Sequence, residues 1–155
     1  NNQLIPEQQA LDLAEEVHKV FEFFEAWAEE KAVALRFVGS PCRVTGDPLM
    51  LRRAISNLLS NAIRYTPAGQ AVTIQLSESA ETVRLVVENP GTPIAAEHLP
   101  RLFDRIYRVD PSRQRKGEGS GIGLAIVKSI VGAHHGSVAA QSDLRSTRFI
   151  VVLPK

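Results

Sequence analysis

The sequence has one cysteine, almost no net charge and no long hydrophobic run, and each of these shortages excludes a class of protein. A single cysteine, Cys42, allows neither an internal disulfide nor a paired-cysteine zinc site, which favours a reducing compartment such as the cytoplasm. The formal net charge of +1 gives no general attraction to nucleic acid. No apolar stretch approaches the roughly 20 residues of a membrane helix. We therefore expect a soluble cytoplasmic domain with no nucleic acid partner.

Hydrophobic residues make up 44% of the 155 residues, enough for one domain with a core of its own. Their spacing predicts three helices, of which the first covers 7–32 and the third 122–135, capped by Gly136. The second is predicted to begin near Asp47-Pro48, an acidic N-cap followed by proline at the first helical position, and to end by Thr66, because the residue before Pro67 is pushed out of the helical region. Alternating hydrophobic residues predict strands over 34–38, 71–76, 82–88, 137–141 and 148–153. This order predicts an α/β fold, a two-layer sandwich with helices on one face of a mixed, mostly antiparallel sheet.

The second predicted helix carries a polar line beside its expected core-facing stripe, which consists of Leu51, Ile55, Leu58 and Ala62. Asn57, Asn61 and Arg64 follow one another at spacings of four and three, and Tyr65 lies one turn beyond Asn61. A solvated helix face would explain isolated polar residues, but asparagine is a poor helix former, so the pair needs a further reason. Amide oxygens are neutral hard ligands, which suit Mg²⁺ that already receives negative charge from phosphate. The line therefore indicates a magnesium nucleotide.

A glycine-rich run, Gly117-Glu118-Gly119-Ser120-Gly121-Ile122-Gly123-Leu124, leads directly into the third predicted helix. Residues without Cβ let backbone N–H groups approach an anion at the positive end of a helix, although such runs are also simple hinges. The run is not a Walker A loop, because Leu124-Ala125 follow Gly123 instead of Lys and a hydroxyl residue. It is not a dinucleotide-binding loop either, because it does not follow a strand.

A third element, Glu88-Asn89-Pro90-Gly91-Thr92-Pro93-Ile94, stands at the end of a predicted strand. Its Pro and Gly residues are typical of a turn. Its position also allows Asn89 to face a ligand. The long irregular segment that follows, up to residue 120, is of a length that is usually functional or mobile in a compact domain.

These elements, in this order, resemble the sequence boxes of histidine kinase catalytic domains, within the wider ATPase superfamily that includes gyrase, the Hsp90 chaperones and MutL. Residues 57–65 resemble the N box, 89–94 the G1 box, 103–108 the F box and 119–124 the G2 box. The resemblance covers nearly the whole chain and implies the Bergerat ATP-binding fold. Residues 87–129 are especially similar to the copper- and silver-sensing histidine kinases of proteobacteria.

The resemblance implies roles for individual residues. Asn61 would coordinate Mg²⁺, with Asn57 helping to hold metal or phosphate, and Asn61 and Arg108 would be the catalytic pair. Arg64 would reach phosphate and Tyr65 would pack near the nucleotide, while Phe103 and Tyr107 would dock a lid formed by residues 95–116. The other residues implied to bind ATP are Asn89, Gly91, Ile94, Tyr107, Arg108, Lys116, Gly117, Gly119, Ser120, Gly121, Ile122, Gly123, Leu124 and Thr147.

Three residues depart from the family's pattern. Asn89 stands where the family has the Asp that accepts a hydrogen bond from the adenine amino group. An amide oxygen can accept the same bond, but without the charge that roughly doubles hydrogen-bond strength, so we expect weaker adenine anchoring. Pro93 replaces the second glycine of G1, and Ser146 stands where a glycine often precedes Thr147.

The function implied is that of the ATP-binding catalytic domain of a two-component sensor histidine kinase. Residues 1–6 would be the stub that follows the dimerisation helices and 7–155 the catalytic domain. The full-length protein would be a membrane-anchored homodimer of the inner membrane with a cognate response regulator as partner, and this domain would lie on its cytoplasmic side. Copper or silver sensing is implied for that protein.

The phosphorylated histidine would lie on a separate domain, since no His-Glu-x-x-Arg-Thr-Pro stretch is present. His18, His134 and His135 are interpreted as surface or helix-capping residues, and His98 as a residue on the lid. The chain is therefore expected to be a monomer that binds ATP without phosphorylating itself.

Two alternatives stay open. An ATP-hydrolysing clamp of the gyrase or MutL kind usually carries a catalytic Glu beside the first Asn of the N box, where this chain has Ser56. A nucleotide-free interaction module would explain the departures at Asn89 and Pro93, but not the intact Asn61 and glycine run.

Overall fold

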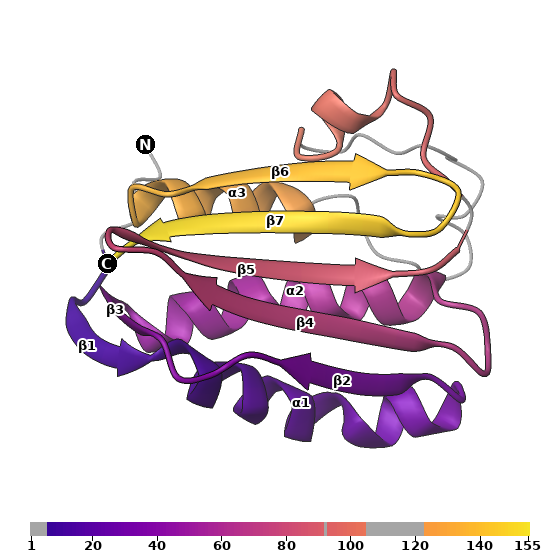
Figure 1. The fold of residues 1–155 in the computed structure, drawn as a ribbon, viewed down its shortest axis with the longest axis horizontal. Helices are drawn as coiled ribbons and strands as arrows, with labels where there is room; N and C mark the ends of the chain where they lie inside the picture. Colours follow the sequence, from indigo (N-terminus) through magenta and orange to yellow (C-terminus); the bar gives the residue numbers. More distant parts are fainter. Residues whose placement is uncertain (1–5, 92, 105–122) are drawn as a thin grey trace.

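The structure, a computed structural model, describes residues 6–91, 93–104 and 123–155. A five-stranded sheet with the order β2-β4-β5-β7-β6 has three helices on one face (Figure 1). Its strands are β2 (Ala34–Val38), β4 (Ala71–Glu78), β5 (Thr82–Asn89), β6 (Ser137–Ser142) and β7 (Thr147–Pro154). The helices are α1 (Leu13–Glu30), α2 (Pro48–Tyr65) and α3 (Gly123–Ala133). Only the β2–β4 pair of this sheet is parallel, so the predicted mixed, mostly antiparallel two-layer sandwich is confirmed.

The core lies between the sheet and the helices. Alternate residues of β4, β5 and β7 are buried there, as expected for strands with one covered face. They pack with the hydrophobic stripe of α2, in which Leu51, Ile55, Leu58 and Ala62 are buried as predicted. None of the helices in the described part of the chain is long and apolar enough to cross a membrane.

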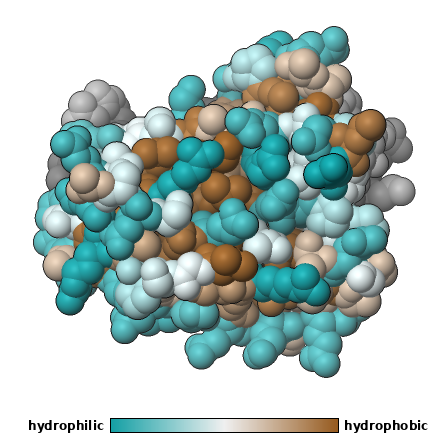
Figure 2. Space-filling view, in the orientation of Figure 1, coloured by the Kyte–Doolittle hydropathy of each residue, from teal (hydrophilic) through white to brown (hydrophobic). Residues whose placement is uncertain are grey.

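The opposite face of the sheet is open to solvent, and hydrophilic and hydrophobic residues are interspersed on it (Figure 2). One row of side chains across the five strands is polar, and its members are Arg36, Thr73, Glu88, Arg148 and Gln141. Within this row Arg148 lies 3.6 Å from Glu88, and it also lies 3.7 Å from Asp143. In the described part of the chain, helices cover only one face of the sheet.

The predicted start of the first helix is wrong. Strand β1 (Gln9–Asp12) pairs antiparallel with β3 (Arg43–Gly46), and α1 begins only at Leu13. Asp12 ends the strand and caps the helix, because its carboxylate accepts hydrogen bonds from the backbone N–H groups of Ala14 at 3.0 Å and Cys42 at 3.3 Å. Leu11 fits the helical spacing, but pairing with a strand more than 30 residues away overrides it.

Helix α2 begins and ends as predicted. The carboxylate of Asp47 accepts hydrogen bonds from Leu49 and Met50 N–H, and Pro48 occupies the first helical position. Thr66 ends the helix in an extended conformation, and its hydroxyl donates to Ala62 O at 2.6 Å. The residue before Pro67 is thus excluded from the helix, for the expected steric reason.

The end of α3 differs from the prediction. His135, not Gly136, adopts the left-handed conformation that ends the helix, with φ of 65°. Its N–H donates to Gly132 O and the N–H of Gly136 donates to Val131 O, both at 2.9 Å. Gly136 is needed for a different reason, because a Cβ there would collide with Val152 O on β7.

Asp47 makes the N-terminal end of α2 sensitive to pH. Hydrogen bonds from the N–H groups of Glu7, Met50 and Leu49 hold the pKa of its carboxyl below its ordinary value. A carboxyl whose pKa is lower in the folded state stabilises the fold above its unfolded pKa, and this stabilisation is lost as the pH falls through the folded value.

Asp47→Asn keeps an acceptor at the cap but removes the charge, so we expect a lower free energy of unfolding at pH 7, by about 0.5–1 kcal/mol. The difference from the native chain should close as the pH falls from about 4 towards 2. Urea unfolding at a series of pH values measures it. A gap of constant size from pH 7 to pH 3 would contradict the charge-based explanation.

Candidate nucleotide-binding site

The polar line of α2 meets the start of α3. Asn57 and Asn61 are half-buried, and the side-chain N–H of Asn57 donates to Gly123 O at 3.1 Å. This bond joins residues 66 positions apart and brings the predicted metal-binding helix to the end of the glycine-rich run. Because Nδ2 is used in this bond, Oδ1 is the atom of Asn57 left to bind a metal or a donor.

A second part of the site lies at the end of β5. Asn89 is only 4% exposed, and its side-chain N–H group donates to Pro90 O at 2.8 Å. Its Oδ1 has no hydrogen-bond partner among the described residues. On the neighbouring strand β7, Thr147 pairs directly with Asn89 and is also buried. The two residues assigned to adenine by resemblance are therefore adjacent in space.

Ser142 is a site residue that the sequence analysis missed. Its hydroxyl accepts a hydrogen bond from the N–H of Ile94 and shares another with the hydroxyl of Thr147, both at 2.8 Å. Ser142 thus ties the turn after β5 to the β6–β7 hairpin. Its direct pairing with Thr147 across that hairpin is the signal that would have pointed to it.

The departure at Ser146 has a structural explanation. Its hydroxyl donates to Glu88 Oε2 at 2.6 Å, and its N–H donates to Asp143 Oδ1 at 3.1 Å. Two bonds to carboxylates, one of them from the side chain that a glycine lacks, hold the residue before Thr147 in place. Its φ is not positive, so the conformation does not require glycine.

Gly91 brings the turn after β5 against the end of α2. Its φ is 144°, and a Cβ at this position would lie 2.9 Å from Tyr65 O. Arg64 and Tyr65 occupy the last turn of α2, at this same end, and both are half-buried. From Asn57 to Tyr65 the helix rises by about 12 Å.

The first part of the predicted lid packs on the sheet. A short 3-10 helix, η1 (Leu99–Arg101), precedes Leu102 and Phe103, both of which are buried. The ring of Phe103 meets that of Phe149 edge to face, with centroids 5.9 Å apart. The predicted docking role of Phe103 agrees with this contact.

Several predicted residues lie outside the described residues: Tyr107, Arg108, Lys116, Gly117, Gly119, Ser120, Gly121 and Ile122. Gly123 and Leu124 begin α3. Among the described residues no three His, Cys, Asp or Glu side chains gather as metal ligands.

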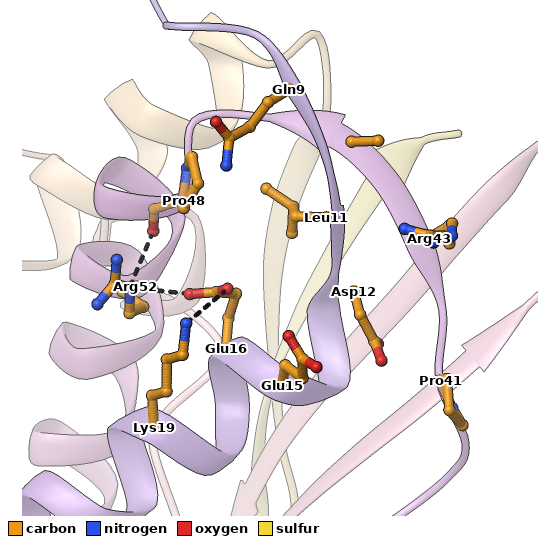
Figure 3. A pocket seen from close by; sticks show the side chains of 11 residues that line it. Gln9, Leu11, Asp12, Glu15, Glu16, Lys19, Pro41, Arg43, Pro48 and Arg52 are labelled. Carbon is orange, nitrogen blue, oxygen red and sulfur yellow. Dashed lines mark hydrogen bonds and ion pairs between the residues drawn. The ribbon is translucent and has the colours of Figure 1, made fainter.

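A hollow lies at the other end of α2, away from these residues. Strand β1, the start of α1 and the start of α2 line it (Figure 3). On its wall Glu16 is buried, with Oε1 2.8 Å from Arg52 Nε and Oε2 3.6 Å from Lys19 Nζ. The N–H of Arg52 is not aligned with Oε1, so the contact is an ion pair without a proper hydrogen bond. None of the residues predicted to bind ATP lines this hollow.

The arrangement defines a class of protein. Helix α2 carries two amides beside the start of α3, and a buried asparagine stands at the end of β5. Residues 46–155 match the family model described as histidine kinase-, DNA gyrase B-, and HSP90-like ATPase. The chain belongs to this family, whose nucleotide is ATP.

Relatives within the family carry more specific names. The sensor histidine kinase CusS of Escherichia coli (strain K12) is 70% identical over 154 residues, which are 99% of this chain and 32% of that protein. The probable sensor kinase SilS of Salmonella typhimurium is 62% identical over 159 residues, covering 100% of this chain and 32% of that protein. The chain thus spans about a third of the length of these curated relatives.

Solved structures agree with the fold. The mycobacterial sensor histidine kinase MprB has a TM-score of 0.84 at 27% identity, covering 95% of this chain and 97% of that chain. Full-length ShkA in complex with AMPPNP has a TM-score of 0.85 at 25% identity, covering 99% of this chain and 32% of that chain. Both are similar to this chain along nearly all of its length.

Gly91→Ala should destabilise the chain by about 1–3 kcal/mol, because the new Cβ meets Tyr65 O and a φ of 144° is unfavourable for alanine. Thermal unfolding measures the loss. Gly69→Ala is the matched control, because Gly69 also has a positive φ, 89°, but nothing lies within 4 Å of its would-be Cβ. Equal losses in the two variants would show that the close approach to Tyr65 contributes nothing.

Proposed function

We propose that the chain is the ATP-binding catalytic domain of a two-component sensor histidine kinase, which donates the γ-phosphate of ATP to a histidine on a separate dimerisation domain. The observation that carries this proposal is the hydrogen bond from Asn57 to Gly123. It places the amides of α2 beside the start of α3, where backbone N–H groups favour phosphate. The names of the relatives, which are sensor histidine kinases, support the choice within the family.

The adenine base of the nucleotide would be recognised by Asn89 and Thr147. Pro90 O engages the N–H group of the Asn89 amide, which leaves the amide oxygen to accept a hydrogen bond from the adenine amino group. Thr147, tied to Ser142, would support the same group. Gly91 would let the backbone approach the base, and Ile94 would be held nearby through its own bond to Ser142.

The phosphate end would be held by α2 and the start of α3. Asn61 and the free oxygen of Asn57 would bind Mg²⁺, which neutralises charge on the phosphates when bound. Arg64 would reach phosphate from the last turn of α2. The resemblance to the family adds further residues that would bind ATP: Tyr107, Arg108, Lys116 and the glycine-run residues 117–122.

A kinase is favoured over an ATP-hydrolysing clamp by Ser56. This half-buried residue precedes Asn57, where the clamp ATPases usually carry a catalytic Glu. A hydroxyl is a much weaker general base than a carboxylate, so water activation from this position is not expected. The nucleotide-free interaction module is opposed by the Oδ1 of Asn89, which has no hydrogen-bond partner among the described residues although the residue as a whole is buried.

The remaining expectations concern the longer protein. We propose residues 7–155 as the catalytic domain, with 1–6 as the stub that follows dimerisation helices and 95–116 as the lid. The whole protein would be a homodimer anchored in the inner membrane, with this domain on the cytoplasmic side and a response regulator as partner. Copper or silver is proposed as its stimulus.

Calorimetric titration with ATP, with and without Mg²⁺, tests the site. We expect saturable binding that depends on Mg²⁺, and a loss of affinity of at least about tenfold in Asn61→Ala, since a metal ligand is removed. The matched control is Ser60→Ala, whose hydroxyl only bonds back to Asn57 O within α2. Absence of binding by the native chain would refute the proposal.

The same preparation tests the expected lack of self-phosphorylation. Incubated with radiolabelled ATP, the isolated chain should carry no label on a denaturing gel. Retained label would show that one of its own histidines is an acceptor, and steady release of phosphate would instead revive the clamp.

Asn89 predicts which base the site prefers. Inosine triphosphate differs from ATP by a carbonyl oxygen in place of the amino group, and this oxygen would face the oxygen of the Asn89 amide. We expect ATP to bind at least about tenfold more tightly, and Asn89→Ala to reduce this preference. Competition calorimetry measures both. Equal affinity of the native chain for the two nucleotides would show that the Asn89 amide does not distinguish the bases, and tighter binding of inosine triphosphate would show that its N–H group faces the base.

A further inference from the structure

His134 bridges the two helices that form the nucleotide site. It follows the last residue of α3 and is 5% exposed, so of the two interpretations, surface or helix-capping, only the helix-capping one agrees with the structure. Its Nδ1 lies 2.8 Å from Ile130 O, in the last turn of its own helix. Its Nε2 accepts a hydrogen bond of 3.0 Å from the N–H of Asp47, which caps α2.

These two bonds define the state of the ring. A backbone N–H can only donate, so Nε2 carries no proton, and a neutral histidine must then carry its proton on Nδ1. That proton is donated to Ile130 O, which caps a carbonyl at the end of α3. The two bonds together therefore need the neutral tautomer with its proton on Nδ1, in which Nδ1 bonds to α3 and Nε2 bonds to the cap of α2.

The surroundings leave the ring no other position. A Cβ on Gly46 would lie 2.6 Å from Cδ2 of His134 and 2.9 Å from Nε2, so the ring fits closely against the backbone before Asp47. The carboxylate of Asp47 also accepts a hydrogen bond of 2.9 Å from Glu7 N–H. Asp47 is thus hydrogen-bonded to His134 at the end of α3, to the first turn of α2 and to Glu7 in the segment before β1.

Helices α2 and α3 are consequently hydrogen-bonded to each other near both ends of α3. At one end His134 holds Asp47, and at the other Gly123 accepts from Asn57. Helix α3 has 11 residues, about 16 Å, and over this length a helix moves along its axis as a rigid rod. A shift at the His134 end would therefore move Gly123 relative to Asn57 and Asn61.

We propose that His134 is a positioning residue for the nucleotide site, which sets the axial register of α3 against α2 and thereby the place of the α3 start relative to the two amides. The nucleotide readout of this inference rests on the proposed function. A buried histidine that served only the stability of the core would lower the unfolding temperature and leave the nucleotide affinity of the folded chain unchanged.

Two substitutions separate the two bonds. His134→Gln can place an amide oxygen where Nε2 lies and keep the bond from Asp47 N–H. His134→Asn can place an amide N–H where Nδ1 lies and keep only the bond to Ile130 O. Both variants lose the ring, so they share its packing cost and differ in the bridge between the helices.

Calorimetry with magnesium ATP, well below the unfolding temperature, measures the effect on the fully folded chain. We expect His134→Gln to bind within about twofold of the native chain and His134→Asn about five- to tenfold more weakly, as a lost bridging bond implies. Equal affinities of the two variants, whether both native-like or both weak, would overturn the proposal.

A second measurement stands apart from nucleotide binding. In NMR spectra, the signals of the Asn57 side-chain amide and the Gly123 backbone should shift in His134→Asn and keep their native positions in His134→Gln. Unshifted signals in both variants would overturn the proposal. Failure of the native chain to bind ATP would instead refute the proposed function and leave this spectral test to decide the role of His134.

Discussion

Helix α2 has to satisfy two neighbours at once, and the rest of the structure depends on this constraint. Its hydrophobic stripe is buried on the sheet, while the amide line beside it meets the start of α3. Rotating the helix would expose the stripe or bury amides without partners, and both changes cost free energy. The packing of the α2 stripe in the core therefore also fixes the direction of the Asn57 and Asn61 side chains, towards the start of α3.

At the proposed adenine end, a neutral residue can present the same kind of acceptor as a charged one. A free amide can turn either atom towards a ligand, since its two ends are nearly alike in shape. In Asn89 the carbonyl of Pro90 takes the N–H group, so the oxygen is the end left over. Backbone geometry supplies the orientation that an aspartate would have without help, although it cannot supply the charge.

Patterns in the sequence predicted those features of the structure that depend on residues close together in the chain. The two stripes of α2, its cap at Asp47 and its end before Pro67 could all be predicted, because each depends on neighbours within a few residues. Strand β1 could not, because its pairing with β3 is a distant contact between two strands of four residues each. Ser142 and the burial of His134 were missed for the same reason, since their partners are Ile94, Thr147 and Asp47.

The strand directions place both ends of the described chain far from the proposed adenine end of the site. Glu7 is bonded beside the start of α2, and Lys155 N–H donates to Glu81 O at the hairpin before β5 (Figure 1). Asn89 lies at the far end of β5, after eight residues of strand or about 26 Å. A fluorescent protein fused to either end, or a resin holding the domain by it, would leave the nucleotide side facing away from the attachment.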